Sequence, residues 1–229
     1  MTLTVTDIAT GWTINRSVKN KAAIWVFEAI EQVVGEFPFP ILGIDSDNGS
    51  EFINARLLAY CTANEITFTR SRPGNNNDGA HVEQKNWTHV RELVGYLRFD
   101  TPAELAVLNE IWALDMSFTN YLLAQQKLVF KQRTGSKVTK RYDRAATPCE
   151  RTLASSDIPE QCRDNLLGSM AAISPGALYW QIRELTERLE NMALRKAPAP
   201  ATPRVNRAFN PSGQAEVLSE AMIRPWRRT

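Results

Sequence analysis

Several features that define particular protein classes are scarce or absent in this chain. Its three cysteines are odd in number and show no metal-ligand spacing, so neither a disulfide framework nor a cysteine-based metal site is predicted. No apolar run reaches the length of a membrane-spanning helix, and no secretory signal follows Met1. These absences predict a cytoplasmic protein in a reducing compartment, with no membrane partner.

Charge and repetition are also weak signals. The 27 basic residues nearly balance the 25 acidic residues, and a net charge of +2 does not by itself predict a nucleic-acid partner. No internal repeat of fixed period is present. What the chain has is 43% apolar and 23% charged residues over 229 positions, which is typical of one large globular domain or two small ones.

The most informative stretch is residues 41–52. Ile41, Leu42 and Ile44 predict a short buried strand that breaks at the turn Asp47-Asn48-Gly49. Asp47 therefore lies at the end of an apolar strand, where open α/β sheets bind their ligands. Because Asp-Asn-Gly is also common in ordinary turns, this stretch alone does not separate a site from a turn.

A second stretch, residues 68–91, supplies a partner for Asp47. A strand that includes Ile66 is followed by a polar, glycine-rich loop and by a helix whose first two turns carry Glu83. Between Asp47 and Glu83 lie 35 residues. Together these features resemble the catalytic core of retroviral integrases and their insertion-sequence transposase relatives, which carries two aspartates and a glutamate, the last two separated by 35 residues. The likeness rests on three strings, Asp-Asn-Gly-Ser-Glu-Phe at 47–52, Arg-Ser-Arg-Pro at 70–73 and Val-Glu-Gln-Lys-Asn at 82–86.

The resemblance implies an α/β fold, a ribonuclease H-like mixed sheet with flanking helices, followed by a C-terminal helical module. It also implies DNA integration or transposition of a mobile element by metal-dependent phosphodiester strand transfer. Asp47 and Glu83 would be catalytic and would bind Mg²⁺ or Mn²⁺, because two such ions can stabilise both the attacking and the leaving oxygens.

The third carboxylate of the family is the weak point of the resemblance. In the family register, the first catalytic aspartate lies on a strand that precedes the one predicted at residues 2–8. On that register the central strand is missing here, and Asp7 is a weak candidate for which a structural role is favoured. We therefore expect either direct pairing of residues 2–8 with residues 41–44 or a gap between them, and a truncated, inactive copy of the enzyme.

Polar and basic side chains are predicted around the site. Arg70, Arg72 and Lys85 suit phosphate, which the planar guanidinium groups can contact in a bidentate manner. Asn86 is expected on the same side of its helix as Glu83, three residues away. An ordinary solvated basic surface remains the alternative.

Residues 127–144 hold a concentration of charge that the total of +2 conceals. Seven basic residues stand against the single acid Asp143, a local net charge of +6 interleaved with Phe130 and Tyr142. This pattern favours contact with the DNA backbone, with steep salt dependence and little sequence preference. The residues expected to contact phosphate are Lys137, Lys140 and Arg141, and a solvated hairpin or loop is the alternative.

Helix signals complete the organisation of the chain. A helix is predicted over 21–34, capped by Asn20 and ended by Gly35, and another over 101–125, where Thr101 and Glu104 form a capping box. A further helix is expected near 149–153, and another begins at residue 175. Its apolar seam from residue 178 to residue 192 resembles that of a coiled coil but is too short to establish one, and packing within its own module is the alternative. The predicted domains are a catalytic core at 1–125, a basic segment with a helical module at 126–195, and a disordered proline-rich linker and tail at 196–229.

Two alternative functions remain open at this point. A noncatalytic DNA-binding remnant or regulator is favoured by the missing first aspartate. A ribonuclease H-like nuclease would use the same carboxylates on another substrate. DNA is the expected partner of the integrase-like enzyme and of the noncatalytic remnant. Whether the chain forms a homo-oligomer is left open.

Overall fold

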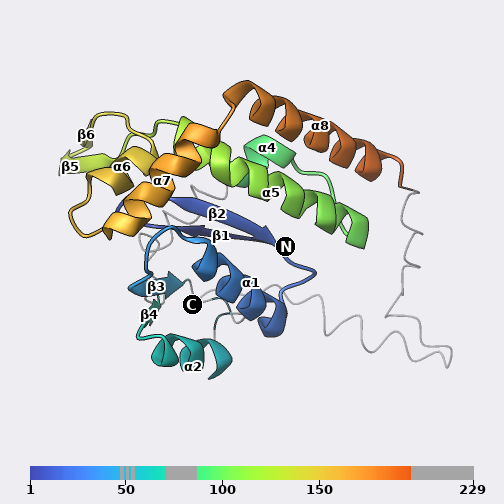
Figure 1. The fold of residues 1–229 in the computed structure, drawn as a ribbon, viewed down its shortest axis with the longest axis horizontal. Helices are drawn as coiled ribbons and strands as arrows, with labels where there is room; N and C mark the ends of the chain where they lie inside the picture. Colours follow the sequence, from blue (N-terminus) through green and yellow to red (C-terminus); the bar gives the residue numbers. More distant parts are fainter. Residues whose placement is uncertain (47–48, 50–51, 53–54, 71–86, 197–229) are drawn as a thin grey trace, which may run out of the picture. The chain divides into compact units, whose positions relative to one another are not determined.

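The structure is a computed structural model that describes residues 1–46, 49, 52, 55–70 and 87–196 (Figure 1). It is a mixed α/β arrangement, as predicted, in which the described strands form two-stranded pairs. Among the described helices, none is both long and apolar enough to cross a membrane. The described elements are β1 (Thr2–Thr6), β2 (Thr13–Ser17), α1 (Ala23–Glu36), β3 (Gly43–Ser46), α2 (Ala55–Ala63), β4 (Thr67–Arg70), the π-helix η2 (Trp87–Arg91), α4 (Glu92–Val94), α5 (Pro102–Leu122), β5 (Leu128–Thr134), β6 (Lys137–Tyr142), α6 (Pro148–Ala154), α7 (Glu160–Ala172) and α8 (Pro175–Leu194).

β1 and β2 form the predicted antiparallel hairpin, and its two faces differ in chemistry. Alternate residues of paired strands share a face, so Leu3, Val5 and Ile14 lie together on the apolar side. The opposite side is a ladder of hydrogen-bonded polar pairs, in which the side chains of Thr2 and Ser17 are 2.9 Å apart. The apolar side contributes to the core, and the polar side contacts α5.

α1 was predicted in the right place, but it ends two residues later than the predicted residue 34. The helix passes through Gly35 to Glu36 and stops before Phe37, because the residue that precedes Pro38 is pushed into an extended conformation. Asn20 accepts a hydrogen bond from the backbone N–H of Ala22 rather than capping the first helical residues. The buried residues recur at the i, i+3, i+4 and i+7 positions of an amphipathic helix, Val26, Ala29, Ile30 and Val33.

β3 and β4 are parallel, with Ser46 in register with Arg70 at their carboxyl ends. The predicted buried strand at 41–44 is displaced by two residues, and Leu42 is 82% exposed. The bounds of β3 are set by its pairing with β4, which runs from Gly43 opposite Thr67 to Ser46 opposite Arg70. No hydrogen-bonded ladder joins β1 to β3 among the described residues, so the direct pairing of residues 2–8 with residues 41–44 is not observed.

α5 begins with the predicted capping box of Thr101 and Glu104, and it is buried on two sides. One side is apolar and joins Val107 and Ile111 to the core. The other side is polar and contacts β2, where the side-chain amides of Asn109 and Asn120 bond to backbone groups of that strand. A helix with polar residues on a buried side was not predicted.

α8 packs against α5 rather than within its own module (Figure 1). Leu189 is 1% exposed in a cluster with Ile111 and Trp112 of α5. Residues Met1–Arg195 form one compact unit, and the division falls before Lys196. The domain boundary between residues 125 and 126 stays a prediction, and the tail from residue 197 onward lies outside the described residues.

Candidate functional site

Most of the predicted site residues are not among those that the structure describes. Asp47 and Glu83 lie outside the described residues, as do Arg72, Lys85 and Asn86. Their roles, and the expected approach of the Asp47 and Glu83 carboxylates, stay predictions. The described neighbours nevertheless show how the edge of the sheet before Asp47 is built.

That edge is the carboxyl end of the parallel pair β3–β4. Ser46 ends β3, so Asp47 follows the last residue of the strand directly, and Arg70 ends β4 opposite Ser46 with an exposed side chain. Because parallel strands bring their carboxyl ends to one edge, Arg70 stands beside the start of the predicted Asp47 turn. The structure therefore supports a basic residue near this edge.

A second carboxylate at this edge was missed in the sequence. Asp45 is exposed on β3 and accepts a hydrogen bond of 2.7 Å from the hydroxyl of Thr69 on β4. The cross-strand pairing of these two residues fixes the bond. The signal in the sequence was the first aspartate of the Asp-Ser-Asp string at 45–47, two residues before Asp47.

The chain that follows Glu83 is attached to the core by η2. His89 and Val90 are buried, and Val90 packs with Val107 and Ile111 of α5. Residues 89–94, which follow Asn86 along the chain, therefore have a fixed place against α5.

Asp7, the candidate third carboxylate for which a structural role was favoured, stabilises the β1–β2 turn. Its Oδ2 atom accepts hydrogen bonds from the backbone N–H of Thr10 at 2.7 Å and from the hydroxyl of Thr10 at 2.6 Å. Its backbone carbonyl accepts from the N–H of Gly11, whose φ of +82° suits glycine. Within the described residues, no group of three histidines, cysteines or acidic residues is placed to hold a metal ion.

The basic segment forms an exposed hairpin of β5 and β6. Every residue of both strands is exposed, including the predicted phosphate contacts Lys137, Lys140 and Arg141. The two-residue connection Gly135-Ser136 has φ of +62° at Gly135, a conformation that glycine adopts without strain and that tight hairpins require. An exposed hairpin is compatible with both interpretations of this segment, contact with the DNA backbone and a solvated surface.

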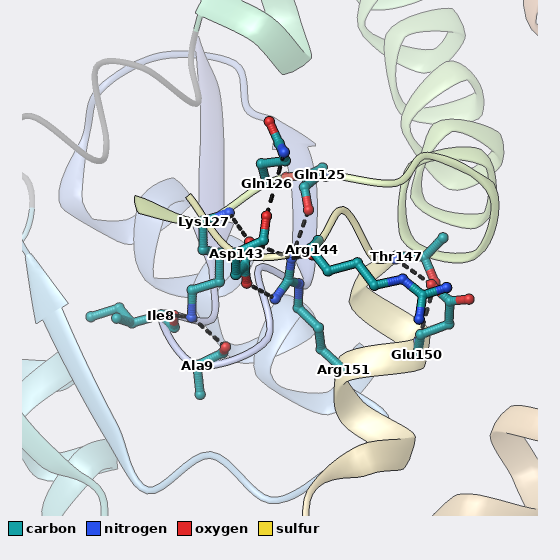
Figure 2. A network of polar contacts seen from close by, with 10 residues as sticks. All are labelled: Ile8, Ala9, Gln125, Gln126, Lys127, Asp143, Arg144, Thr147, Glu150 and Arg151. Atoms are coloured by element: carbon teal, nitrogen blue, oxygen red, sulfur yellow. Dashed lines mark hydrogen bonds and ion pairs between the residues drawn. The ribbon is translucent and has the colours of Figure 1, made fainter. Parts of the chain in front are cut away.

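The base of the hairpin is held by a network of polar contacts, which we call the hairpin anchor: Lys127, Asp143 and Arg151 (Figure 2). Arg151 of α6 places Nη1 2.5 Å from Asp143 Oδ2 and Nη2 3.3 Å from Oδ1. The backbone N–H of Lys127 donates to Asp143 Oδ1 at 2.6 Å. The Nζ of Lys127 donates to the backbone carbonyls of Ile8, at 2.8 Å, and Ala9, at 2.5 Å.

In the hairpin anchor, Arg151 pairs with Asp143, the single acid of residues 127–144. Asp143 therefore does not offset the positive charge of the exposed hairpin. The hydrogen bond from Arg151, followed by that from the Lys127 backbone, lowers the pKa of Asp143, which keeps the carboxylate ionised and paired. The role of Arg151 was missed because it lies outside the basic segment. The only local signal was the capping box of Thr147 and Glu150, which starts α6 and places Arg151 in its first turns.

Comparison with known families gives a match for the first third of the chain. Residues 1–76 match the family model described as "Integrase core domain". This confirms the resemblance to the integrase core for these residues, which include Asp47 but not Glu83.

Comparisons with individual proteins reach further along the chain. An uncharacterized protein of Sinorhizobium fredii, y4rM, is 39% identical over 150 residues, which is 66% of this chain and 43% of that protein. The chain thus spans less than half the length of this relative. Among solved structures, a simian T-cell lymphotropic virus intasome in complex with PP2A regulatory subunit B56 gamma is similar at 15% identity and a TM-score of 0.48, over 69% of this chain and 51% of that one. The catalytic core domain of BIV integrase is similar at 19% identity and a TM-score of 0.39, over 65% and 82%.

Proposed function

We propose that this protein takes part in DNA integration or transposition of a mobile element, and that Asp47 and Glu83 belong to a divalent-metal site for phosphodiester transfer. The observation that carries the proposal is the integrase core match over residues 1–76, combined with the string that contains Asp47 and the 35-residue spacing to Glu83. The described geometry supports it, because the carboxyl edge of β3 and β4 leads directly into Asp47.

The donor set fits a hard cation. Asp47 and Glu83 both offer carboxylate oxygens, the ligands that Mg²⁺ prefers and Mn²⁺ accepts. Asp45, two residues before Asp47, is exposed but accepts a hydrogen bond from Thr69 through Oδ1, so it is not counted among the ligands. When bound, such ions supply charge stabilisation to the attacking and leaving oxygens of the transferred phosphodiester.

The basic residues of the chain bind and position the DNA in this proposal. Arg70 at the end of β4, with Arg72, Lys85 and Asn86, contacts phosphate near the carboxylates. The exposed hairpin contacts the DNA backbone away from them. Guanidinium and ammonium groups on such surfaces bind phosphate largely without regard to sequence.

A second candidate function is DNA binding without catalysis by residues 1–229. The observation that favours it is the bonding of Asp7, whose Oδ2 atom is engaged by Thr10. Two carboxylates supply less charge than the family uses, so one metal position would be held poorly. Residues 1–229 alone are accordingly expected not to catalyse strand transfer. A ribonuclease H-like nuclease is the third candidate.

A metal titration tests the site independently of activity. We expect Mn²⁺ binding to purified residues 1–229, followed by calorimetry, to weaken at least about tenfold in Asp47→Asn and in Glu83→Gln, because each variant removes one charged ligand. Asp7→Asn is the control and should bind Mn²⁺ like the wild type. Equal binding by all four proteins would remove the assignment of Asp47 and Glu83.

An activity test separates the three candidate functions. Residues 1–229 are incubated with Mg²⁺ or Mn²⁺ and a plasmid that carries the genomic DNA flanking the gene, and both joined and cleaved products are measured. Joined products that disappear in Asp47→Asn would indicate a complete transfer enzyme. Cleavage alone would favour the nuclease, and neither product would favour DNA binding. Joined products that disappear in Asp7→Asn would identify Asp7 as the third carboxylate.

A further inference from the structure

The β5–β6 hairpin has two faces, and its register divides the basic residues between them. Lys131 pairs with Lys140, and Arg133 pairs with Val138, so these side chains share one face, which we call the Lys131 face. Arg141 pairs with Phe130 and Lys137 pairs with Thr134 on the opposite face, the Arg141 face. The three predicted phosphate contacts are therefore not on one surface.

The charges on the Lys131 face are concentrated. Lys131 and Lys140 are directly opposite across the strands, and Arg133 is two positions along from Lys131 on the same side. Like charges at directly opposed positions are unfavourable in a free hairpin. On the Arg141 face the two cations lie near opposite ends of β6, one beside the turn and one beside the base. A ligand of high negative charge density thus fits the Lys131 face better.

Nothing in the described residues neutralises this face. The hairpin from residue 128 to residue 142 contains no acid, and Asp143 is held by Arg151 in the hairpin anchor. Of the ion pairs formed among described residues, none includes Lys131, Arg133 or Lys140. Arg133 donates Nε to the carbonyl of Gly135 at 3.2 Å, which aligns its guanidinium beside the turn.

The hairpin is also a preformed shape. A two-stranded ribbon fits the major groove of B-DNA, and β5 with seven residues extends over about 20 Å. The hairpin anchor fixes its base to α6 and to the β1–β2 turn, so little order has to be gained on binding (Figure 2). Val138 and Tyr142, which are exposed on the Lys131 face, offer apolar and hydroxyl contacts beside the cations.

We infer that the β5–β6 hairpin binds duplex DNA through one face, with Lys131, Arg133 and Lys140 contacting the phosphates that border a groove, while Lys137 and Arg141 point away. The inference rests on the proposed function for its choice of DNA as the partner, and not for catalysis or metal binding.

The test compares two variants that each lose two charges. Lys131→Gln with Lys140→Gln alters the Lys131 face, and Lys137→Gln with Arg141→Gln alters the opposite face. Binding of purified residues 1–229 to a fluorescent 25-base-pair duplex of arbitrary sequence is measured by anisotropy at several KCl concentrations in EDTA. We expect the slope of log K against log[KCl] to become shallower by about 2 in the first variant. In the second variant it should stay within about 0.5 of the wild type.

A conservative variant separates charge from folding. Lys131→Arg with Lys140→Arg keeps both cations and should restore the wild-type slope. Equal slope changes in the two glutamine variants, or no change in the first, would overturn the inference. Binding to vesicles rich in phosphatidylserine with the same dependence on Lys131 and Lys140 would overturn the choice of DNA. Because EDTA is present, loss of the proposed metal site would leave this result unaffected.

Discussion

The side-chain amide of Asn120 lies against the main chain of Thr13 and makes both hydrogen bonds that a neighbouring strand would make. Its Nδ2 donates to the Thr13 carbonyl at 2.8 Å, and its Oδ1 accepts from the Thr13 N–H at 2.9 Å. Asn109, three helical turns earlier, does the same for Ser17 at 3.1 and 2.9 Å. The outer edge of β2 is thereby closed by α5 rather than left open for another strand.

Replacing Asn120 with alanine should destabilise the fold by about 2–4 kcal/mol, because two backbone groups of Thr13 would be left without partners in a buried position. Urea unfolding followed by circular dichroism measures the change. Asn191→Ala on the exposed side of α8 is the matched control and should change the unfolding free energy by less than about 0.5 kcal/mol. Equal effects of the two substitutions would contradict the role of the amide.

Asp115 gives the fold a pH dependence of known sign. Burial raises its pKa to about 6, against the smaller opposing effect of hydrogen bonds from Thr119 and Asn15. The folded state therefore binds more protons than the unfolded state between about pH 4 and 6, and stability falls as pH rises through this window. Asp115→Asn should remove that slope and stabilise the protein by about 1–3 kcal/mol at pH 7.5.

The measurement is urea unfolding of the wild type and the Asp115→Asn variant at pH 4.5 and 7.5. Asp164→Asn, at an exposed position of α7, is the control and should retain the pH dependence of the wild type. A loss of stability in Asp115→Asn of the same size at both pH values would show that the hydrogen bonds of Asp115 outweigh its burial.

Breaking the hairpin anchor should loosen β5 and β6 without unfolding the core. Arg151→Gln removes the fork that holds Asp143, so backbone amides of residues 128–142 should exchange with deuterium faster while those of α5 do not. The same loosening should appear in the wild type at acid pH, because a lowered pKa means that the pairing of Asp143 is lost only as pH falls through that lowered value. Arg183→Gln, which breaks an exposed pair on α8, should leave the hairpin unchanged.

Truncation of Leu189 tests whether α8 is part of the core. Its side chain is 1% exposed against α5, so Leu189→Ala should cost about 2–5 kcal/mol in unfolding free energy. Leu194→Ala removes the same atoms from a side chain that is 64% exposed and should cost less than about 0.5 kcal/mol. A similar result for both leucines would mean that α8 folds apart from residues 1–125.

The parts of the fold that could be predicted depend on short-range chemistry. Thr101 with Glu104 and Thr147 with Glu150 satisfy each other's backbone and side-chain groups within four residues, so the starts of α5 and α6 followed from the sequence. The polar contact between Asn120 and Thr13 spans 107 positions. No local pattern distinguishes a buried asparagine that faces a strand edge from an exposed one.

The same distinction between short-range and long-range contacts applies to the candidate site. The charge of residues 127–144 was visible in the sequence, but the separation of Lys140 from Lys137 and Arg141 needed the strand register. Asp45 was overlooked because its partner Thr69 is on another strand. The arrangement of Asp47 and Glu83 stays a prediction, since both lie outside the described residues.

The contact of Lys127 with the β1–β2 turn has an evolutionary consequence. Its ammonium group binds the main-chain carbonyls of Ile8 and Ala9. Every amino acid has a main-chain carbonyl, whatever its side chain. The two turn positions can therefore vary freely in side chain while the attachment persists, whereas Lys127 cannot be exchanged for a shorter or uncharged residue without losing it. Descendants of this chain should accumulate substitutions at positions 8 and 9 and few at position 127.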